Sequence, residues 1–111
     1  PKAVLHCFTG TQKELDDYLN IGFYIGLTGW ICDERRNVDL RKSLINIPIE
    51  KLMIETDCPY LIPRNLNDKP KNNRNEPSYL PHIAKEIADL VKIDVNKFVE
   101  VTYANSINFF K

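Results

Sequence analysis

The chain has 111 residues, which is enough for one small domain with a modest core. Hydrophobic residues make up 43% of it and charged residues 27%, a composition typical of globular proteins that excludes an intrinsically disordered chain. Because 15 basic and 15 acidic side chains give a formal net charge of zero, the chain does not hold nucleic acid by bulk positive charge alone, although a locally basic rim around a site is compatible with this balance.

The first half of the chain alternates short apolar runs with helical patterns. Residues 3–5 are predicted to form a strand, and residues 11–20 a helix. A second strand over residues 23–28 is followed, after a loop, by a helix that includes residues 38–45. Residues 51–55 form the third strand, with three consecutive apolar residues at its centre. Apolar strands that alternate with helices indicate parallel βαβ units, in which helices cover both faces of the sheet.

The second half begins with a long polar loop over residues 56–76, and a loop of this length is either functional or a linker. An amphipathic helix over residues 80–91 follows, with Ser78 as its expected N-cap. Asp94 is the expected N-cap of a last helix that continues past Thr102.

Three parallel strands with their helices leave two open edges, whereas parallel sheets normally close into a barrel or extend into a wider sheet. The pattern therefore predicts that strands are missing. The chain also begins with Pro1 rather than methionine and enters at once what looks like a buried strand. We interpret it as a fragment or a processed piece.

The three cysteines, Cys7, Cys32 and Cys58, are too few and too scattered for a disulfide framework, and none forms a CxxC pair. We expect small buried side chains in a reducing, cytoplasmic compartment. No run approaches the roughly 18 apolar residues of a membrane span, and no signal-peptide pattern opens the chain, so we expect no membrane association.

Reactive side chains follow the strands where each of them ends. His6 follows the first strand, residues 30–36 follow the second, and Glu55 and Asp57 end the third. Residues two apart in a strand point to the same side, so we expect both carboxylates to face one way. Burying two carboxylates together is costly unless a cation or hydrogen bonds compensate, and a divalent metal ion is the usual compensation. The alternatives are a core histidine at residue 6 and turn or capping carboxylates at residues 55 and 57.

Four motifs in the same order resemble the TatD family of metal-dependent hydrolases: HCFTG at residues 6–10, YIGLTG at 24–29, ETDCPYL at 55–61 and RNEP at 74–77. The stretch WICDERR at residues 30–36 resembles the deoxyribonucleases of that family rather than its more distant members. The resemblance covers the whole chain.

The resemblance implies an α/β fold of the amidohydrolase type, a (β/α)₈ TIM-type barrel of which residues 1–111 form the C-terminal segment, with about three strands and their helices. It also implies 3′→5′ exonuclease action on DNA, with RNA as an alternative substrate, at a centre of two divalent metal ions. Mg²⁺ or Mn²⁺ is expected, with Zn²⁺ as the alternative. By this resemblance His6 and Asp57 bind metal, Asp57 also helps to activate the attacking water, and Glu55 sits beside it in the site.

The departure from the family pattern is one of extent. The N-terminal HxH pair, the bridging glutamate and an earlier histidine of the family have no counterpart in this sequence. His82 is the only other histidine, and we interpret it as a surface or helix-cap residue. Two or three ligands do not hold a two-metal centre with useful affinity, so we expect the chain alone to be inactive.

Four further residues are predicted to bind the substrate. Arg64 and Arg74 in the long loop, together with Arg35, would grip phosphates, and Trp30 would stack on a base. The alternatives are solvated loop charges, an exposed helix start at Arg35 and a core or interface aromatic at Trp30.

Two other functions compete with the nuclease. The first is a different amidohydrolase-type reaction on the same barrel, such as C–N bond or ester hydrolysis, because a fold does not determine its chemistry. The second is a non-catalytic remnant that self-associates through its open sheet edges.

Overall fold

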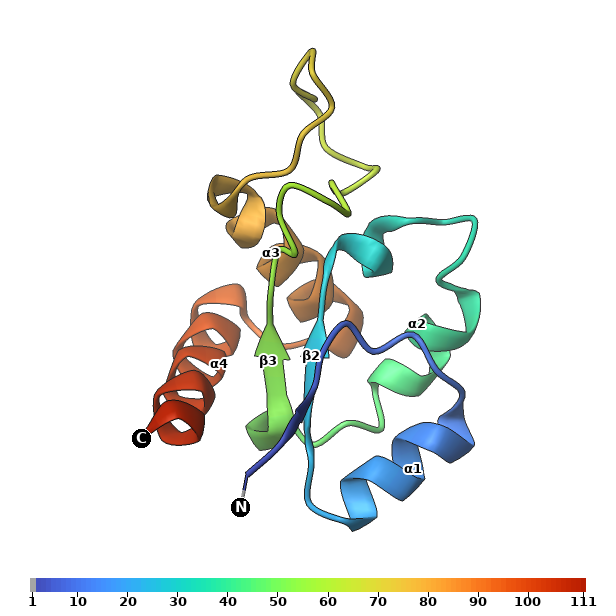
Figure 1. The fold of residues 1–111 in the computed structure, drawn as a ribbon, viewed down its shortest axis with the longest axis vertical. Coiled ribbons are helices and arrows are strands. Elements are labelled where there is room, and N and C mark those ends of the chain that lie inside the picture. The colour runs from blue at the N-terminus through green and yellow to red at the C-terminus, as the bar shows by residue number, and fades with distance from the viewer. Residues whose placement is uncertain (1) are drawn as a thin grey trace.

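A sheet of three short parallel strands organises the chain in a computed structural model that describes residues 2–111 (Figure 1). Strands β1 (Val4–Leu5), β2 (Tyr24–Leu27) and β3 (Leu52–Ile54) lie in the order β1-β2-β3. Ile25 at the centre pairs with Leu5 on one side and with Leu52 on the other. Because all three strands run the same way, the residues that follow them emerge at one edge of the sheet.

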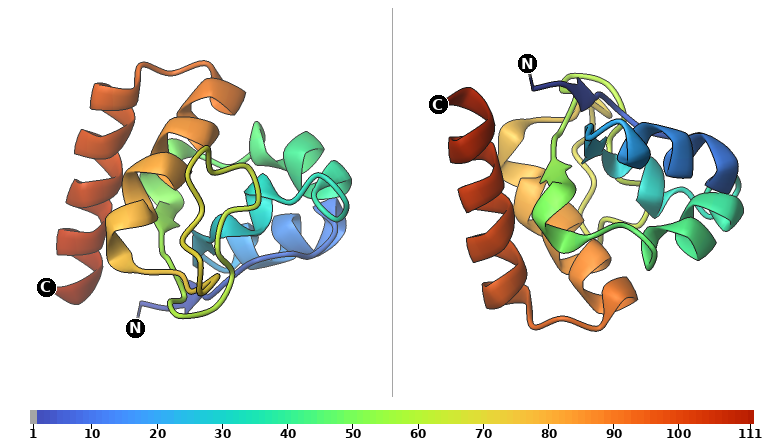
Figure 2. Two further views of the ribbon diagram at one scale, coloured as in Figure 1. Left: turned by 90° about the horizontal axis from the view of Figure 1, so that it is seen from above. Right: turned by 90° about the horizontal axis from the view of Figure 1, so that it is seen from below.

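Four helices surround this sheet. Figures 1 and 2 show α1 (Gln12–Asn20) and α2 (Val38–Leu44) on one flank, α4 (Val95–Phe110) on the opposite flank and α3 (Leu80–Val91) between them behind the strands. Three short 3₁₀ segments join these elements: η1 (Gly29–Cys32), η2 (Ile49–Lys51) and η3 (Pro77–Tyr79). In Figure 1 the long loop after β3 rises above the carboxyl ends of the strands.

The core forms where the sheet meets α1, α2, α3 and α4. Its largest fully buried apolar side chains come from every part of the chain: Leu15, Ile25, Leu27, Ile31, Leu44, Leu52, Ile83, Ile87 and Phe98. Ile25 and Leu27 point to one face of β2 and are buried, and Gly26 between them, which points to the other face, is buried as well. This is the pattern of a strand covered on both sides.

The expected elements are confirmed, with shorter strands than the apolar runs suggested. Helix α1 starts with a capping box, in which the Thr11 hydroxyl accepts from the Glu14 N–H and the Glu14 carboxylate accepts from the Thr11 N–H. Asp94 caps α4 as predicted, since its carboxylate accepts from the N–H groups of Asn96 and Lys97.

Two predictions about single residues were wrong. Ser78 is not the N-cap of α3, because Pro77 starts a 3₁₀ turn that runs directly into the helix, and the Ser78 hydroxyl instead donates to the Glu76 carboxylate. Cys58 is exposed rather than buried, because it lies in the turn beyond β3, whereas Cys32 is buried and Cys7 is half-buried.

Part of the apolar surface faces outward. Along α4, Val99, Tyr103, Ile107 and Phe110 are 47%, 67%, 51% and 78% exposed and follow one another at helical spacing. The outer sides of β1 and β3 have no strand partner within residues 2–111. Over those same residues, no helix is long and apolar enough to cross a membrane.

Candidate active site

His6, Glu55 and Asp57 meet at the carboxyl edge of the sheet. The Nδ1 atom of His6 contacts Oε1 of Glu55, and its Nε2 atom lies 3.5 Å from Oδ1 of Asp57. The side chains of His6, Glu55 and Asp57 are 63%, 22% and 35% exposed, so this cluster opens to solvent. The structure therefore brings together the three residues that the sequence placed at the ends of two different strands.

The two carboxylates reach His6 by a different route from the one expected. Strand β3 ends at Ile54, before either acidic residue, and Asp57 adopts a left-handed backbone conformation with φ 58°. The Asp57 carbonyl accepts a hydrogen bond from the Tyr60 N–H at 2.9 Å, which closes a turn. Alternation along a strand was therefore the wrong reason for the convergence, because a turn directs Asp57 toward the histidine.

The Glu55 carboxylate is held in place by the backbone of Cys7. Its Oε2 atom accepts a hydrogen bond from the Cys7 N–H at 3.1 Å, while Oε1 faces His6. The carboxylate lies across Gly26 of β2, where a Cβ atom would overlap Oε2. The absence of a side chain at Gly26 is thus what lets Glu55 cross from β3 toward β1. The sequence pattern does not reveal this role, although Gly26 belongs to the YIGLTG motif.

The contacts of the imidazole limit its chemistry. When the Nδ1–H group of a neutral His6 ring donates a hydrogen bond to Glu55, Nε2 presents a lone pair toward the Asp57 carboxylate. Two electron-rich atoms facing each other are stable only with a proton or a cation between them. Two ligands bound at about 2.0–2.2 Å to one cation lie about 3.0–3.6 Å apart, which matches the 3.5 Å between Nε2 and Oδ1.

His6 and Asp57 therefore fit as two ligands of one metal ion, with Glu55 orienting the ring from behind, as carboxylates do in many metal sites. They do not form a complete site. Among residues 2–111, no group of three or more His, Cys, Asp or Glu side chains has the arrangement needed to hold a metal ion.

Cys7 lies directly beside this cluster. Burial raises the pKa of its thiol, and the nearby carboxylates of Glu55 and Asp57 raise it further, against the opposing effect of a hydrogen bond with Thr28. Burial likewise raises the pKa of Cys32 to about 12. Both thiols stay protonated near neutral pH, and a protonated thiol is a poor nucleophile.

A second polar region begins one residue after β2. The Thr28 hydroxyl oxygen lies 3.3 Å from Sγ of Cys7 and accepts from the Trp30 N–H at 3.2 Å. Thr28 thus joins the His6 cluster to the loop that carries Trp30. Next to it, Gly29 packs so closely on Leu61 that a Cβ atom would overlap the Leu61 carbonyl oxygen.

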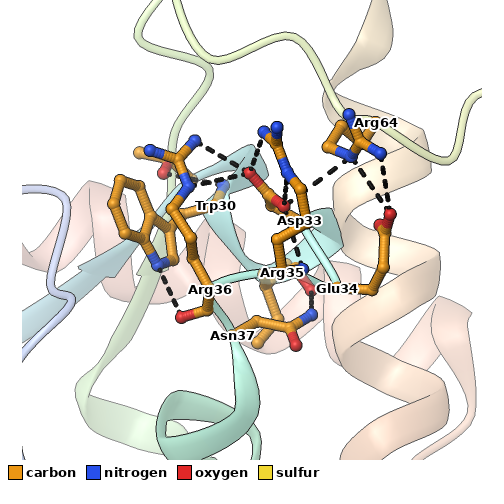
Figure 3. A network of polar contacts seen from close by, with 9 residues as sticks. Trp30, Asp33, Glu34, Arg35, Arg36, Asn37 and Arg64 are labelled. Atoms are coloured by element: carbon orange, nitrogen blue, oxygen red, sulfur yellow. Dashed lines mark hydrogen bonds and ion pairs between the residues drawn. The ribbon is translucent and has the colours of Figure 1, made fainter.

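Asp33 is the centre of this second region (Figure 3). Its carboxylate is only 5% exposed and accepts from Arg35 through Nε and Nη2, both at 2.9 Å, and from Arg36 through Nε at 2.8 Å. Arg64, from the long loop, lies 3.7 Å from the same carboxylate and donates to Glu34 at 2.9 Å. One buried acid therefore gathers three guanidinium groups.

These contacts lower the pKa values of the two carboxyl groups, Asp33 and Glu34. Hydrogen bonds from the Arg35 side chain, helped by Arg36, hold the pKa of Asp33 well below its usual range and outweigh the opposite effect of burial. A hydrogen bond from Arg64 lowers the pKa of Glu34. Both groups are therefore ionised throughout the neutral range.

Trp30, Arg35 and Arg64 line one pocket of about 280 Å³, as does Lys69. The Arg36 guanidinium lies 4.0 Å from the centre of the Trp30 ring, and the indole N–H donates to the Arg36 carbonyl. Trp30 is half-buried and has one ring face covered in this way. The predicted phosphate and base contacts of these three residues remain predictions.

Arg74 does not line this pocket, although its neighbour Asn73 does, and the Arg74 side chain is exposed. Its neighbour Asn75 is buried, and its amide donates to the carbonyls of Thr56 and Tyr60 at 2.7 and 2.8 Å. Asn75 therefore ties the two ends of the long loop together, a role that its polar surroundings in the sequence did not reveal. His82 contacts Asn65 and does not join the His6 cluster.

The sequence of this chain matches one family model, described as TatD related DNase, over residues 1–111. It is 55% identical over 111 residues to a protein of Edwardsiella piscicida named 3′-5′ ssDNA/RNA exonuclease TatD, an alignment that covers 100% of this chain and 43% of the relative. A protein of the same name from Citrobacter rodentium is 54% identical over 110 residues, which cover 99% of this chain and 42% of the relative. The chain thus spans about two fifths of the length of the curated relatives it matches.

Solved structures agree. A hydrolase TatD family protein from Entamoeba histolytica superposes with a TM-score of 0.85 at 35% identity, over 97% of this chain and 42% of that protein. A TatD homolog from Escherichia coli superposes with a TM-score of 0.80 over 94% of this chain and 38% of the homolog, and at 20% identity it supports the fold alone. The expected fold class, part of an amidohydrolase-type (β/α)₈ barrel, is confirmed.

We predict that Gly26→Ala is destabilising because the added methyl group displaces the Glu55 carboxylate. Overpacking of this kind costs about 1–3 kcal/mol, measurable by urea unfolding. The double variant Gly26→Ala/Glu55→Ala is expected to recover part of that loss, since the clashing atoms are gone. Strictly additive effects of the two substitutions would contradict this account.

We also predict that Asp33 stabilises the fold by an amount that depends on pH. Its pKa is lower in the folded protein than the value of about 3.9 expected in the unfolded chain, so its stabilisation is complete above that value and is lost as the pH falls through the folded pKa. The free energy of unfolding, measured with urea, should therefore be clearly higher for the wild type than for Asp33→Asn at pH 6. This difference should shrink toward pH 2. Asp68→Asn, at an exposed loop position, is the control. If the free energies of unfolding of Asp33→Asn and the wild type, plotted against pH, stay parallel down to pH 2, the assignment would be refuted.

Proposed function

The chain belongs to the TatD-related DNase family, and from this premise we propose that it forms the C-terminal segment of a single barrel domain with metal-dependent 3′→5′ exonuclease activity on single-stranded DNA or RNA. The observation that carries the proposal is the convergence of His6, Glu55 and Asp57 at the carboxyl edge of a parallel sheet. Active sites of (β/α)₈ barrels lie at this edge.

We propose that His6 and Asp57 hold a divalent cation, Mg²⁺ or Mn²⁺ in preference to Zn²⁺, and that a complete site contains two such ions. Support comes from the spacing of Nε2 and Oδ1 and from the chemistry of the donors, an imidazole nitrogen and a carboxylate oxygen. When bound, divalent cations polarise a phosphodiester and make an attacking water more acidic.

Each residue of the cluster has its own task in this proposal. Glu55 accepts a hydrogen bond from the Nδ1–H group of His6 and so directs Nε2 toward the reaction centre. Asp57 takes up the proton of the attacking water, for which its 35% exposure leaves access. The backbone N–H of Cys7 keeps the Glu55 carboxylate in place while this happens.

Substrate contacts are proposed at the second polar region. Arg35 and Arg64 would bind phosphates of the nucleic acid strand, and Trp30, which lines the same pocket, would support a base. Arg74 would contact the strand outside the pocket from its exposed position on the long loop. Similarity to relatives named 3′-5′ ssDNA/RNA exonuclease supports a nucleic acid substrate.

We further propose a reducing, cytoplasmic location for this chain. All three cysteines are free thiols in the structure, and none lies in a disulfide. Among residues 2–111 no membrane-spanning helix occurs, and the proposal does not involve a membrane.

Self-association is proposed for the chain when it is alone. The outer strands of the sheet keep unpaired edges within the described residues, and the exposed stripe of α4 adds apolar surface. Both features favour burial against a second copy.

The nuclease proposal is tested with a 3′-labelled single-stranded DNA and magnesium. We expect no cleavage by this chain alone, and cleavage by a chimaera in which the N-terminal part of the Edwardsiella piscicida relative precedes it. His6→Ala and Asp57→Ala in the chimaera should each reduce the rate by at least about 100-fold, the scale of losing a catalytic acid–base group.

Lys97→Ala on α4 is the matched control, since this exposed residue lies outside the cluster, and it should leave the rate unchanged. A chimaera that fails to cut DNA but hydrolyses an amide or ester substrate would support the alternative amidohydrolase reaction. A chimaera whose cleavage is indifferent to Asp57→Ala would overturn the assignment of the site.

Sedimentation velocity tests self-association. We expect a dimer or larger species for this chain, and we expect Tyr103→Lys on the exposed stripe of α4 to shift the distribution toward monomer. Asn108→Lys adds the same charge to an exposed polar position of the same helix and serves as the control. A sharp monomer for the wild-type chain at micromolar concentration would rule self-association out.

A further inference from the structure

The pocket between the loop after β2 and the long loop after β3 is lined by more basic than acidic side chains. The pocket of about 280 Å³ is lined by one acidic residue, Asp33, and by four basic residues: Arg35, Arg36, Arg64 and Lys69. Glu34 pairs with Arg64 and offsets one more charge. The group therefore keeps a net positive charge, and an anion in the pocket would relieve the repulsion among the guanidinium groups.

The guanidinium groups of Arg35 and Arg36 are also arranged to bind an anion. Asp33 uses Nε and Nη2 of Arg35 and the same two atoms of Arg36. Within residues 2–111, Nη1 of each of these two arginines makes no hydrogen bond, so each retains free N–H donors. Such planar donors suit the oxygen atoms of a phosphate, and Arg36 is further immobilised against the Trp30 ring.

The place of the pocket relates it to the candidate active site. Thr28 contacts Cys7 on one side and Trp30 on the other, and the Cys7 N–H binds the Glu55 carboxylate. A few residues at the carboxyl end of β2 thus separate the pocket from the His6 cluster. A strand with one phosphate at that cluster has further phosphates within a few bonds on either side.

We propose that Asp33 is a positioning residue that holds Arg35 and Arg36 as ligands for a non-scissile phosphate of a single-stranded nucleic acid, and that the pocket they line with Arg64 and Lys69 is this phosphate subsite. The inference rests on the proposed function for the identity of the substrate. It adds to that function the group that is bound, two further basic residues and the acid that orders them.

Substitution of Asp33 separates two explanations, because they predict opposite changes in the affinity for nucleic acid. Asp33→Asn removes a negative charge from the pocket, so a simple electrostatic effect would tighten the binding of nucleic acid. Loss of positioning has the opposite effect, because Arg35 and Arg36 lose their shared carboxylate and must be ordered when the phosphate binds.

The experiment measures the binding of a fluorescently labelled ten-nucleotide thymidine oligomer by anisotropy, on this chain, with a chelator present to exclude metal binding. We expect Asp33→Asn to weaken binding by about ten-fold despite the added positive charge. Arg35→Gln and Arg36→Gln should each weaken it to a similar extent and reduce the slope of log Kd against log salt by about one. Arg41→Gln, which removes an equal charge from α2 outside this pocket, should change neither quantity beyond a small general effect.

Unchanged or tighter binding by a folded Asp33→Asn would overturn the positioning role. Should circular dichroism show that this variant is unfolded, the exposed Arg35 and Arg36 variants decide, and salt slopes equal to that of the wild type would overturn the subsite. Because the assay measures binding without turnover, a chimaera that cuts DNA while these variants bind normally would refute this inference and leave the proposed function intact. The labelled oligomer can also be displaced by a competitor. If inorganic phosphate displaces it but an unlabelled oligomer does not, the assignment of the pocket to a nucleic acid strand would likewise be overturned.

Discussion

The parallel pairing of β2 with both of its neighbours is the constraint on which the rest of the structure depends. Ile25 pairs with Leu5 on one side and Leu52 on the other, so the three strands end at the same edge. His6 emerges there from β1, Thr28 from β2 and Glu55 from β3. A change in register at β2 would separate these side chains, because successive residues of a strand point to opposite faces.

The central strand also sets how closely the neighbouring elements approach. At Gly26 the Glu55 carboxylate crosses the strand, and at Gly29 the backbone of Leu61 lies against it. The first approach orients the histidine of the cluster, and the second forms a wall of the basic pocket. Two glycines, Gly26 in β2 and Gly29 at the start of η1, therefore shape both polar regions, while Thr28 between them connects the regions by hydrogen bonds.

Local patterns predicted the elements well, and their failures have local causes. Periodic apolar positions identified the strands and helices because burial repeats along each element. Ser78 was misplaced because the preceding proline starts a 3₁₀ turn, and Cys58 because it lies beyond the end of β3. The convergence of Glu55 and Asp57 was predicted for the wrong reason, since a left-handed residue and a turn, rather than strand alternation, bring Asp57 to His6.

The sequence by itself determined the order of the elements, the parallel sheet and the family, because these depend on periodicity and on short motifs whose residues are neighbours in the chain. Only the tertiary structure decided which polar groups meet. Arg64 reaches Glu34 across 30 residues of sequence, and Asn75 closes the long loop on Thr56 across 19. Such pairings follow from the path of the chain through space, and no local pattern encodes them. The physical reason is that a buried charge or amide takes the partner that packing places beside it.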